Sequence, residues 1–485
     1  MAASIEVEAQ VAATFASIPG PAATDAVAYN SRNHQYLLEL HEEYGDIFAL
    51  DVSSMARAAT DYGAATKRVV FAREPGTVRS VLQSDHQFAK TWDAEDQGTE
   101  SVDYVHNLVQ PMLGGTVFNQ QGEGGAHQGR LTLKPMFSAA KDLAPGFARQ
   151  IDRALDAWPT EGRFDALAMC HDLIRQALLY AIGGGSASTA DAATEETFHE
   201  VLDYFVGRYS GATHDATVTA EDEVMMAKAK DAGMRIVQAW REEGSPETED
   251  KTMLAVMAKA GNSDEEMAAM LVNAIIAGAE APGSTLAQLL QELAFNPPLL
   301  AALQSETDAI APAGTDVYAV NDKLKYVEAT VFEALRFFAP ATLVQRVAIE
   351  DTVLDGYEIP AGTVVGLCVT AIHRDEKTYA NPWSFDPVGR GKLNVYLLKK
   401  ENCFMTFSGG PRGCPGKHLG IMMMRLALGK IVQRFEVSAS WRRAGDHLND
   451  THLEARGLPK FVEWWADGIP LEIATRGAAK PKAKM

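Results

Sequence analysis

The chain has 485 residues, of which 47% are hydrophobic, and a formal net charge of −20 at pH 7. This length and apolar content allow a large buried core, whereas the acidic balance disfavours nucleic acid or an anionic membrane as a partner. No segment has the composition of an interdomain linker, and no internal repeat is present. We therefore expect one domain over residues 1–475, followed by a basic, disordered tail at 476–485.

The cysteine pattern and the N-terminus suggest where the protein works. The four cysteines, at positions 170, 368, 403 and 414, have no paired spacing such as C-x-x-C. Residues 1–10 contain no basic residue and no apolar run long enough to cross or anchor in a bilayer. These features favour a reducing compartment and argue against a signal peptide or a membrane anchor. We expect a cytoplasmic protein.

Apolar spacing predicts mostly helices in the first two thirds of the chain. A helix is expected over 31–44, followed by two strands, 46–51 and 68–72, that pair with each other. Helical periodicity then dominates. The predicted helices are 75–83, 126–137, 144–157, 165–183, 192–207, 220–243, 264–295, 298–308 and 325–338.

A second β region follows these helices. Extended segments are predicted over 342–349, 352–359 and 363–369, with hairpin signals at Gly356 and at the turn 360–362. The predicted fold class is therefore mainly α with a small β subdomain.

The most informative stretch is the glycine-rich segment 404–420, which surrounds Cys414. A thiolate binds a metal well when backbone N–H groups, cations or a helix N-terminus stabilise its charge. Glycines on both sides of Cys414 permit a tight turn, and Arg412 supplies a fixed cation. Pro415 suits the first position of a helix, which the apolar run 419–430 continues. Cys414 is therefore a candidate metal ligand at the positive end of a helix.

Five residues of this segment carry a family resemblance. Phe407, Gly410, Arg412, Cys414 and Gly416 match the pattern F-x-x-G-x-R-x-C-x-G, by which the chain resembles soluble, bacterial-like members of the cytochrome P450 family. The resemblance implies the cytochrome P450 fold over nearly the whole chain, haem b as cofactor and Cys414 as the axial iron ligand. It also implies that Phe407 and Arg412 bind the cofactor, Arg412 through a haem propionate.

The resemblance implies three further haem contacts. Arg346 lies in the extended segment that carries an arginine to a propionate, although a solvent-facing strand position is the alternative. Arg130 matches the arginine of a W-x-x-x-R pattern that holds the other propionate. Ala126 occupies the tryptophan position of that pattern, and His127, one place along, either contacts the haem or is a surface histidine.

A supporting motif is the pair Glu333 and Arg336, which matches the family's E-x-x-R. In the family this pair is buried, is joined by a second arginine and stabilises the scaffold behind the haem. Gly389 stands where that second arginine is expected, so the sequence leaves open whether Arg390 takes its place. The segment 373–375 (His-Arg-Asp) matches a family segment that we interpret as structural.

The helix predicted over 264–295 contains a departure from the family. Its A-G-x-[D/E]-T-[T/S] motif is here residues 277–282, in which the acid is retained as Glu280 and the threonine is replaced by Ala281. In the family that threonine hydroxyl helps to deliver protons during oxygen activation. Pro282 cannot donate an N–H and clashes with the preceding turn, so we expect the helix to open or kink at Gly278.

Several groups are candidates for the missing hydroxyl. An ordered water, a substrate hydroxyl, Ser284 or Thr285 is able to complete a proton path on this face of the helix. The alternative for Ser284 and Thr285 is a buried hydroxyl bonded to a preceding carbonyl.

The resemblance implies a monooxygenase that inserts one atom of O2 into a small, largely hydrophobic substrate, with Glu280 as the candidate for proton delivery. Electrons are expected from NAD(P)H through a separate reductase and a ferredoxin-type donor, to a protein that is expected to be monomeric. The basic residues Lys392, Lys399, Lys400, Arg412 and Lys417 lie on the face that receives such a donor, or are plain solvated surface. Substrate contacts are expected from 104–112, Asn273, Ala277 and 339–344.

Two other functions remain open at this stage. The loss of the threonine is compatible with a haem-thiolate isomerase or dehydratase, or a peroxide-using enzyme, that needs no external electrons. A carboxylate-guided peroxygenase is disfavoured because Ala281, not arginine, precedes Pro282. The hypothesis from another class is a non-catalytic haem sensor.

Overall fold

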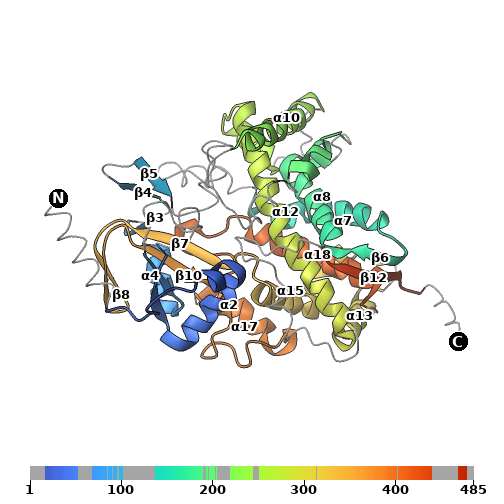
Figure 1. Ribbon diagram of the computed structural model, residues 1–485. Coiled ribbons are helices and arrows are strands. Elements are labelled where there is room, and N and C mark those ends of the chain that lie inside the picture. The colour runs from blue at the N-terminus through green and yellow to red at the C-terminus, as the bar shows by residue number, and fades with distance from the viewer. Residues whose placement is uncertain are drawn as a thin grey trace.

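The fold is known from a computed structural model of the protein. It describes residues 17–52, 68–84, 86–89, 91–94, 98–101, 136, 138–188, 193–194, 196–201, 204, 219–243, 251–312, 314–400, 402–439 and 468–477. Strands β7 and β10 lie on one side of the molecule with α2, α4 and α17, whereas β6 and β12 lie on the other side beside α7, α13 and α18, and the long helix α12 runs along that side (Figure 1). The mainly helical fold class predicted from the sequence is confirmed.

The helices make up most of the described structure. The longer ones are α2 (Ala26–Tyr44), α4 (Pro75–Gln83), α7 (Ala140–Asp156), α8 (Ala166–Ser188), α10 (Ala220–Glu243), α12 (Asp264–Phe295), α13 (Pro297–Ile310), α15 (Lys325–Phe337), α17 (Pro387–Lys400) and α18 (Lys417–Arg434). The shorter ones are α11 (Met253–Lys259), α14 (Val317–Val320), α16 (Val369–His373) and the 3-10 turns η2 (Asn321–Lys323) and η3 (Gly410–Arg412).

Helix α12 shows how local sequence sets an element's limits. The Ser263 side chain caps its N-terminus, and the Ser263 N–H donates in turn to the Glu266 carboxylate at 2.8 Å. This reciprocal pair satisfies donors that the first turn leaves free. The helix ends at Asn296, whose side chain caps α13. Helix α12 continues through Pro282, which lies inside it.

The main sheet joins both predicted β regions. It has the order β1-β2-β10-β7-β3, with all neighbours antiparallel except β2 and β10. The predicted pairing of β1 with β2 is confirmed, with Ile47 opposite Ala72. The parallel pairing of Val69 with Val364 unites the two regions, which the sequence had shown as separate. The strands are β1 (Ile47–Asp51), β2 (Arg68–Ala72), β3 (Phe88–Ala89), β7 (Leu343–Ala348) and β10 (Val364–Cys368).

Smaller sheets complete the β structure. Two are hairpins, one of which turns at Asp355 and Gly356, both with positive φ, as the glycine had predicted. The third has the order β11-β12-β6 and was not predicted, because its strands lie far apart in the chain. The strands are β4 (Thr91–Ala94) with β5 (Gly98–Ser101), β8 (Thr352–Leu354) with β9 (Tyr357–Ile359), and β6 (Glu161–Asp165), β11 (Phe435–Ser438) and β12 (Pro470–Thr475).

Arg476, the first residue of the basic segment, is bonded to the rest of the fold. Arg476 forms a pair of hydrogen bonds with Asp308 of α13, at 2.9 and 2.6 Å. Its backbone N–H donates to the carbonyl of Arg434. A bidentate pair of this kind orders the arginine side chain. Residues 478–485 lie outside the described part of the chain.

The predicted elements agree with the observed ones most closely for long, periodic segments. Helices 75–83, 220–243 and 264–295 are reproduced to the residue. Most of the helix predicted over 126–137 and part of that over 192–207 fall outside the described residues. Helices α11, α14, α16 and α17 were not predicted. Among the described helices, none has the length and apolar character needed to cross a membrane.

The largest hydrophobic core lies among the helices and includes side chains of α7, α8, α10, α12, α15 and α18. Two carboxyl groups of α12 are buried, those of Glu280 and Glu292. Burial raises the pKa of Glu292 to about 7, although a hydrogen bond with Asn296 acts in the opposite direction. The fold therefore favours the protonated acid.

We expect Glu292 to make stability depend on pH. Its folded-state pKa is raised, so its contribution is complete below pH 4.5 and is lost as the pH rises from there through 7. A shift of this size corresponds to roughly 3 kcal/mol. Chemical unfolding of wild type and Glu292→Gln between pH 4 and 8 should show the wild type losing stability relative to the variant. Parallel pH curves would contradict this assignment.

Candidate functional site

Cys414 lies in a tight loop between η3 and α18. The Cys414 N–H donates to the carbonyl oxygen of Phe407 at 2.8 Å, and the Gly413 N–H donates to that of Gly410 at 3.0 Å. The loop therefore folds back on itself and presents the thiol at its outer side, where Cys414 is exposed. Two predicted cofactor residues, Phe407 and Cys414, are thus joined directly by the backbone.

The turn before Cys414 requires glycine at position 410. Gly410 has φ +65°, and a Cβ atom there would lie 1.9 Å from the backbone oxygen of Leu82 at the end of α4. Ser408 also has a positive φ, of 53°. Such conformations are costly for residues with a side chain. The loop is therefore held in a strained shape against α4.

Helix α18 begins after the cysteine, as predicted, but not at Pro415. Its first residue is Lys417, and Gly416 precedes it as the cap. Pro415 lies in the turn between Cys414 and the helix. The positive end of the helix thus lies three residues beyond the thiol, within the range of its dipole.

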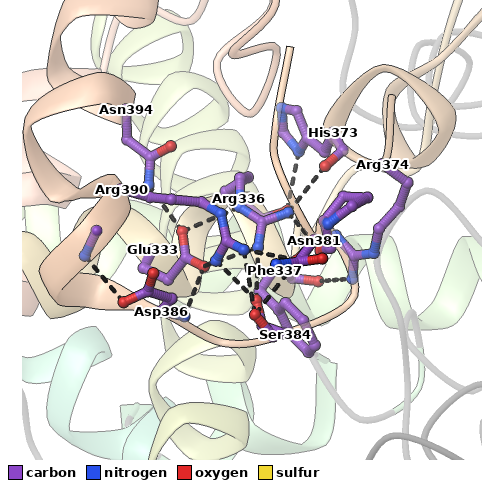
Figure 2. A network of polar contacts seen from close by, with 12 residues as sticks. Glu333, Arg336, Phe337, His373, Arg374, Asn381, Ser384, Asp386, Arg390 and Asn394 are labelled. Atoms are coloured by element: carbon purple, nitrogen blue, oxygen red, sulfur yellow. Dashed lines mark hydrogen bonds and ion pairs between the residues drawn. The ribbon is translucent and has the colours of Figure 1, made fainter. Parts of the chain in front are cut away.

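Behind the loop lies a buried ion network centred on Glu333 (Figure 2). Arg336 donates to both carboxylate oxygens of Glu333, through Nε at 2.9 Å and Nη2 at 2.7 Å. Its other guanidinium hydrogens reach the carbonyls of His373, Pro382 and Ser384. Every donor of Arg336 therefore has an acceptor, which a buried guanidinium requires.

Arg390 completes this network and resolves the question that the sequence left open. Its Nη1 lies 2.9 Å from the Oε1 of Glu333, and its side chain is nearly fully buried. The Asp386 side chain accepts from the Gly389 N–H at 2.9 Å and so caps the start of α17. This helical turn carries the guanidinium of Arg390 to Glu333, although Gly389 occupies the position where the family pattern has arginine. Asn394, one turn further along α17, also donates to Glu333.

His373 connects the network to the loop that carries the cysteine. Its Nδ1 donates to the carbonyl of Arg336 at 2.9 Å, while its Nε2 accepts from the Met405 N–H at 2.7 Å. Burial, together with the charges of Arg336 and Arg374, lowers the pKa of His373 well below its usual value. The ring is therefore neutral, which suits one donor and one acceptor. The structural interpretation of segment 373–375 is confirmed.

Two further hydrogen bonds fix the same loop. The Thr406 hydroxyl donates to the carbonyl of Leu335 at 2.6 Å, and the Tyr379 hydroxyl donates to that of Cys403 at 3.1 Å. Phe404 packs between the rings of Phe332 and His373. The chain leading to Cys414 is thus bonded on one side to α15 and on the other to the segment after α16.

On α12 the predicted proton-path residues separate into two environments. The Thr285 hydroxyl donates to the carbonyl of Ala281 at 2.9 Å, which is the structural alternative foreseen for it. The Ser284 hydroxyl instead donates to the Oε1 of Glu280 at 3.1 Å. His171 of α8 contacts both Glu280 and Ser284, and sequence reasoning missed it, because nothing in the sequence links positions 113 residues apart.

The remaining candidates fall at the following places. Arg346 is buried on β7, opposite Val365 of β10, which excludes the solvent-facing alternative. Arg412 is half-buried in η3.

The residues predicted to contact substrate differ in exposure. Ala277 is exposed on α12, whereas Asn273 is buried and donates to the carbonyl of its own helix at Ala269. In the segment 339–344, Ala339 and Thr342 are buried and Val344 is half-buried. Arg130, His127 and the segment 104–112 lie outside the described residues.

The cysteines show which thiol suits haem iron. Cys170, Cys368 and Cys403 are buried, and Cys414 is exposed. Burial raises the pKa of the Cys170 thiol and raises that of Cys368 to about 11, so both stay protonated at neutral pH. An accessible thiol close to a helix N-terminus is the donor that thiolate ligation needs. The residues present therefore fit the haem that the resemblance implies.

Comparison with known proteins supports the same family. The family model described as Cytochrome P450 matches residues 192–452, just over half of the chain. Cytochrome P450 3A15 of Cavia porcellus is 33% identical over 178 residues, 36% of this chain and 34% of the relative. Cytochrome P450 3A2 of Rattus norvegicus is 33% identical over 179 residues, with the same two shares.

A third relative has a different name. Thromboxane-A synthase of Mus musculus is 32% identical over 169 residues, 34% of this chain and 31% of the relative. The match spans about a third of the length of each of these mammalian relatives.

Removing the charge of Glu333 should destabilise the protein strongly. Glu333→Gln leaves two buried guanidiniums without their carboxylate, which typically costs about 3–5 kcal/mol. Lys325→Gln is the matched control, because Lys325 and Glu328 form a pair of the same spacing on α15 but exposed, with Lys325 68% exposed. The control should change the free energy of unfolding by less than about 0.5 kcal/mol. Equal effects of the two substitutions in chemical denaturation would contradict the network's structural role.

Gly410→Ala should disrupt the cysteine loop. It combines an unfavourable φ with a clash against the Leu82 backbone, and we expect a loss of roughly 2 kcal/mol or more. Gly45→Ala is the control, because Gly45 has φ +96° but no atom within 4 Å of an added Cβ. Thermal unfolding and the haem content of the purified variants provide the measurement. If Gly410→Ala is as stable as Gly45→Ala and contains as much haem, the contact of the loop with α4 is unimportant.

Proposed function

Because this chain belongs to the cytochrome P450 family, whose cofactor is haem b, we propose that it is a haem-thiolate monooxygenase that oxidises a small, largely hydrophobic molecule. The observation that carries the proposal is the exposed Cys414 in its strained loop, together with the buried network that holds this loop. The proposed reaction consumes R–H, O2, NAD(P)H and H⁺ and yields R–OH, NAD(P)⁺ and water.

Each proposed role follows from a residue's place and chemistry. Cys414 holds the iron, and haem supplies the oxygen-activating chemistry when bound. Arg412 and Arg346 bind its propionates, since arginine pairs with carboxylates through two parallel hydrogen bonds. Phe407, whose carbonyl accepts from the Cys414 N–H, would pack against the haem when it is bound. Arg130 and His127 retain the haem-binding roles predicted from the sequence.

Helix α12 provides the proposed oxygen-binding face. Ala277 is exposed, and Ala281 and Pro282 are half-buried, so this part of the helix offers small apolar side chains to a substrate. Glu280 is buried beside it and is the proposed source of protons. Small side chains here are consistent with the largely hydrophobic substrate that we propose.

The proposed electron source is a ferredoxin-type donor with an NAD(P)H-dependent reductase. Lys392 and Lys400 are exposed on α17, which follows the network, and Lys417 opens the helix after Cys414. Positive charges near the cysteine suit an acidic donor. The acidic net charge and unpaired cysteine spacing support a cytoplasmic protein without nucleic-acid partners, and we propose that it is a monomer.

One observation supports a second candidate function. Ala281 replaces the hydroxyl that serves oxygen activation in the family, and one relative is named a synthase, thromboxane-A synthase. A haem-thiolate isomerase or dehydratase acting on a peroxide needs neither O2 nor external electrons. We therefore propose it as the second candidate.

The spectrum of the reduced carbon-monoxide complex tests the ligand. Wild type should show the red-shifted band of thiolate-ligated haem, and Cys414→Ala should lose it because the sulfur is removed. Cys170→Ala is the control, since Cys170 is buried, and should keep the band. Persistence of the band in Cys414→Ala would overturn the assignment.

Turnover separates the two functions. Wild type is supplied with NADPH, a ferredoxin and its reductase, together with small hydrophobic compounds selected by their effect on the iron spin state. We expect O2 consumption and oxygenated product, both dependent on NADPH. Conversion of an organic peroxide or endoperoxide without NADPH, and no oxygenation with it, would favour the isomerase. No spin-state response, O2 consumption or conversion would favour a haem sensor.

A further inference from the structure

A polar cluster lies between α8 and α12, beside the face that carries Ala281. The Nε2 of His171 lies 2.9 Å from the Oγ of Ser284 and 3.5 Å from the Oε2 of Glu280. Ser284 is fully buried and donates to the other oxygen of Glu280 at 3.1 Å. Three groups able to exchange protons therefore contact one another across the helix interface.

Helices α8 and α12 pack closely where the His171 side chain lies between them. A Cβ atom at Gly283 would lie 2.3 Å from the Cδ2 of His171 and 3.0 Å from its Cα. Any larger residue at 283 would push α8 away from α12. Because Gly283 has no side chain, His171 lies close enough to α12 to contact Ser284.

The hydrogen bonds in the cluster have a defined direction. The single hydroxyl proton of Ser284 is donated to Glu280, so Ser284 accepts through its oxygen, and the Nε2 of His171 is the donor to it. The His171 side chain is 19% exposed and that of Glu280 is 11% exposed. The chain of bonds therefore runs from a partly accessible imidazole, through a buried hydroxyl, to a mostly buried carboxylate.

Neighbouring hydroxyls do not offer the same path. Thr285 donates its proton to the carbonyl of Ala281, an acceptor that cannot pass a proton on. Ala281 itself has no hydroxyl. Among the described side chains on this part of α12, Ser284 is therefore the hydroxyl that connects a carboxylate to a second titratable group.

We propose that His171, Ser284 and Glu280 form a proton relay that replaces the missing threonine hydroxyl. The inference rests on the proposed monooxygenase function. For each O2 consumed, one oxygen atom leaves as water and takes up two protons. Each proton enters at His171 from solvent, moves through the Ser284 hydroxyl to Glu280 and is released on the Ala281 side, after which the three groups regain their initial protonation. His171 and Ser284 are positioning residues for Glu280 in this scheme.

Three substitutions interrupt the relay at successive points, namely His171→Gln, Ser284→Ala and Glu280→Gln. Glutamine at 171 retains a hydrogen-bond donor but carries no titratable proton. Thr307→Ala is the control, because Thr307 is a buried helix hydroxyl of α13 bonded to the carbonyl of Leu303. All four variants should retain the red-shifted carbon-monoxide band, which shows that the thiolate site is intact.

The first measurement uses NADPH, O2, a ferredoxin with its reductase, and thioanisole as probe. Each relay variant should lower the O2-driven rate about tenfold to a hundredfold, with KM changed less than twofold, and should release more hydrogen peroxide per NADPH than wild type. The peroxide yield is measurable whether or not thioanisole is oxidised. With iodosylbenzene, which transfers its oxygen without O2 or protons, the variants should match wild type.

The second measurement does not depend on activity. A double-mutant cycle in chemical unfolding compares His171→Ala, Glu280→Gln and the double variant. If the two side chains interact as the distances indicate, the double variant is less destabilised than the sum of the single variants. Strict additivity would overturn the cluster itself.

The outcomes separate the relay from the proposed function. Wild type that consumes no O2 with NADPH would overturn both. Active wild type with undisturbed rates and peroxide yields in the three variants would overturn the relay alone. Variants that fail equally with iodosylbenzene would show a general defect of the site and would also overturn the relay.

Discussion

The structure depends on one buried carboxylate that is shared by two guanidiniums. Glu333 accepts from Arg336 and Arg390, and these three side chains together carry a net charge of +1 in the core. Backbone carbonyls of residues 373–384 surround the excess positive charge and accept from both arginines. The ring of Tyr379, 5.1 Å from the Arg336 guanidinium, adds a cation–π contact. A charge of this kind is tolerated only where every donor is satisfied, so the network dictates the path of the segment around it.

The position of Cys414 follows from that path. His373 is held by the carbonyl of Arg336 and in turn accepts from the backbone of Met405, nine residues before the cysteine. Thr406 bonds to α15 directly. From there the chain is confined by the close approach of Gly410 to α4. The loop that carries the thiol is therefore placed by a continuous set of buried contacts that starts at Glu333.

The other side of the proposed site depends on α12 and its contact with α8. Glycines allow the close approach of the two helices, since Gly278 faces Leu178 and Gly283 faces His171. The acid of the family motif is thereby placed against a histidine from another helix. The loss of one hydroxyl at Ala281 is accompanied by a polar cluster one turn further along, which is why we assign the two features to the same process.

The sequence alone determined the features that local chemistry controls. The helix limits at 75–83, 220–243 and 264–295 followed from caps and apolar spacing, and the cysteine motif identified the cofactor because few sequences place glycine, arginine and cysteine at those intervals. The motif Glu333–Arg336 was also recognised from the sequence, because its two residues are neighbours on one helix face. The helix start at Pro415 was misjudged, because the turn after Cys414 outweighs the preference of one residue.

Only the tertiary structure decided which distant groups meet. Arg390 reaches Glu333 because Asp386 caps an unpredicted helix, and His171 reaches Glu280 because glycine lets two helices approach. Strand β12 pairs with β11, which precedes it along the chain, and with β6 across more than 300 residues, a separation over which sequence patterns carry no signal. The physical reason is common to these cases. A local sequence pattern reflects the secondary structure that a segment prefers by itself. Which distant residues contact each other depends on burial and hydrogen bonding that exist only once the chain has folded.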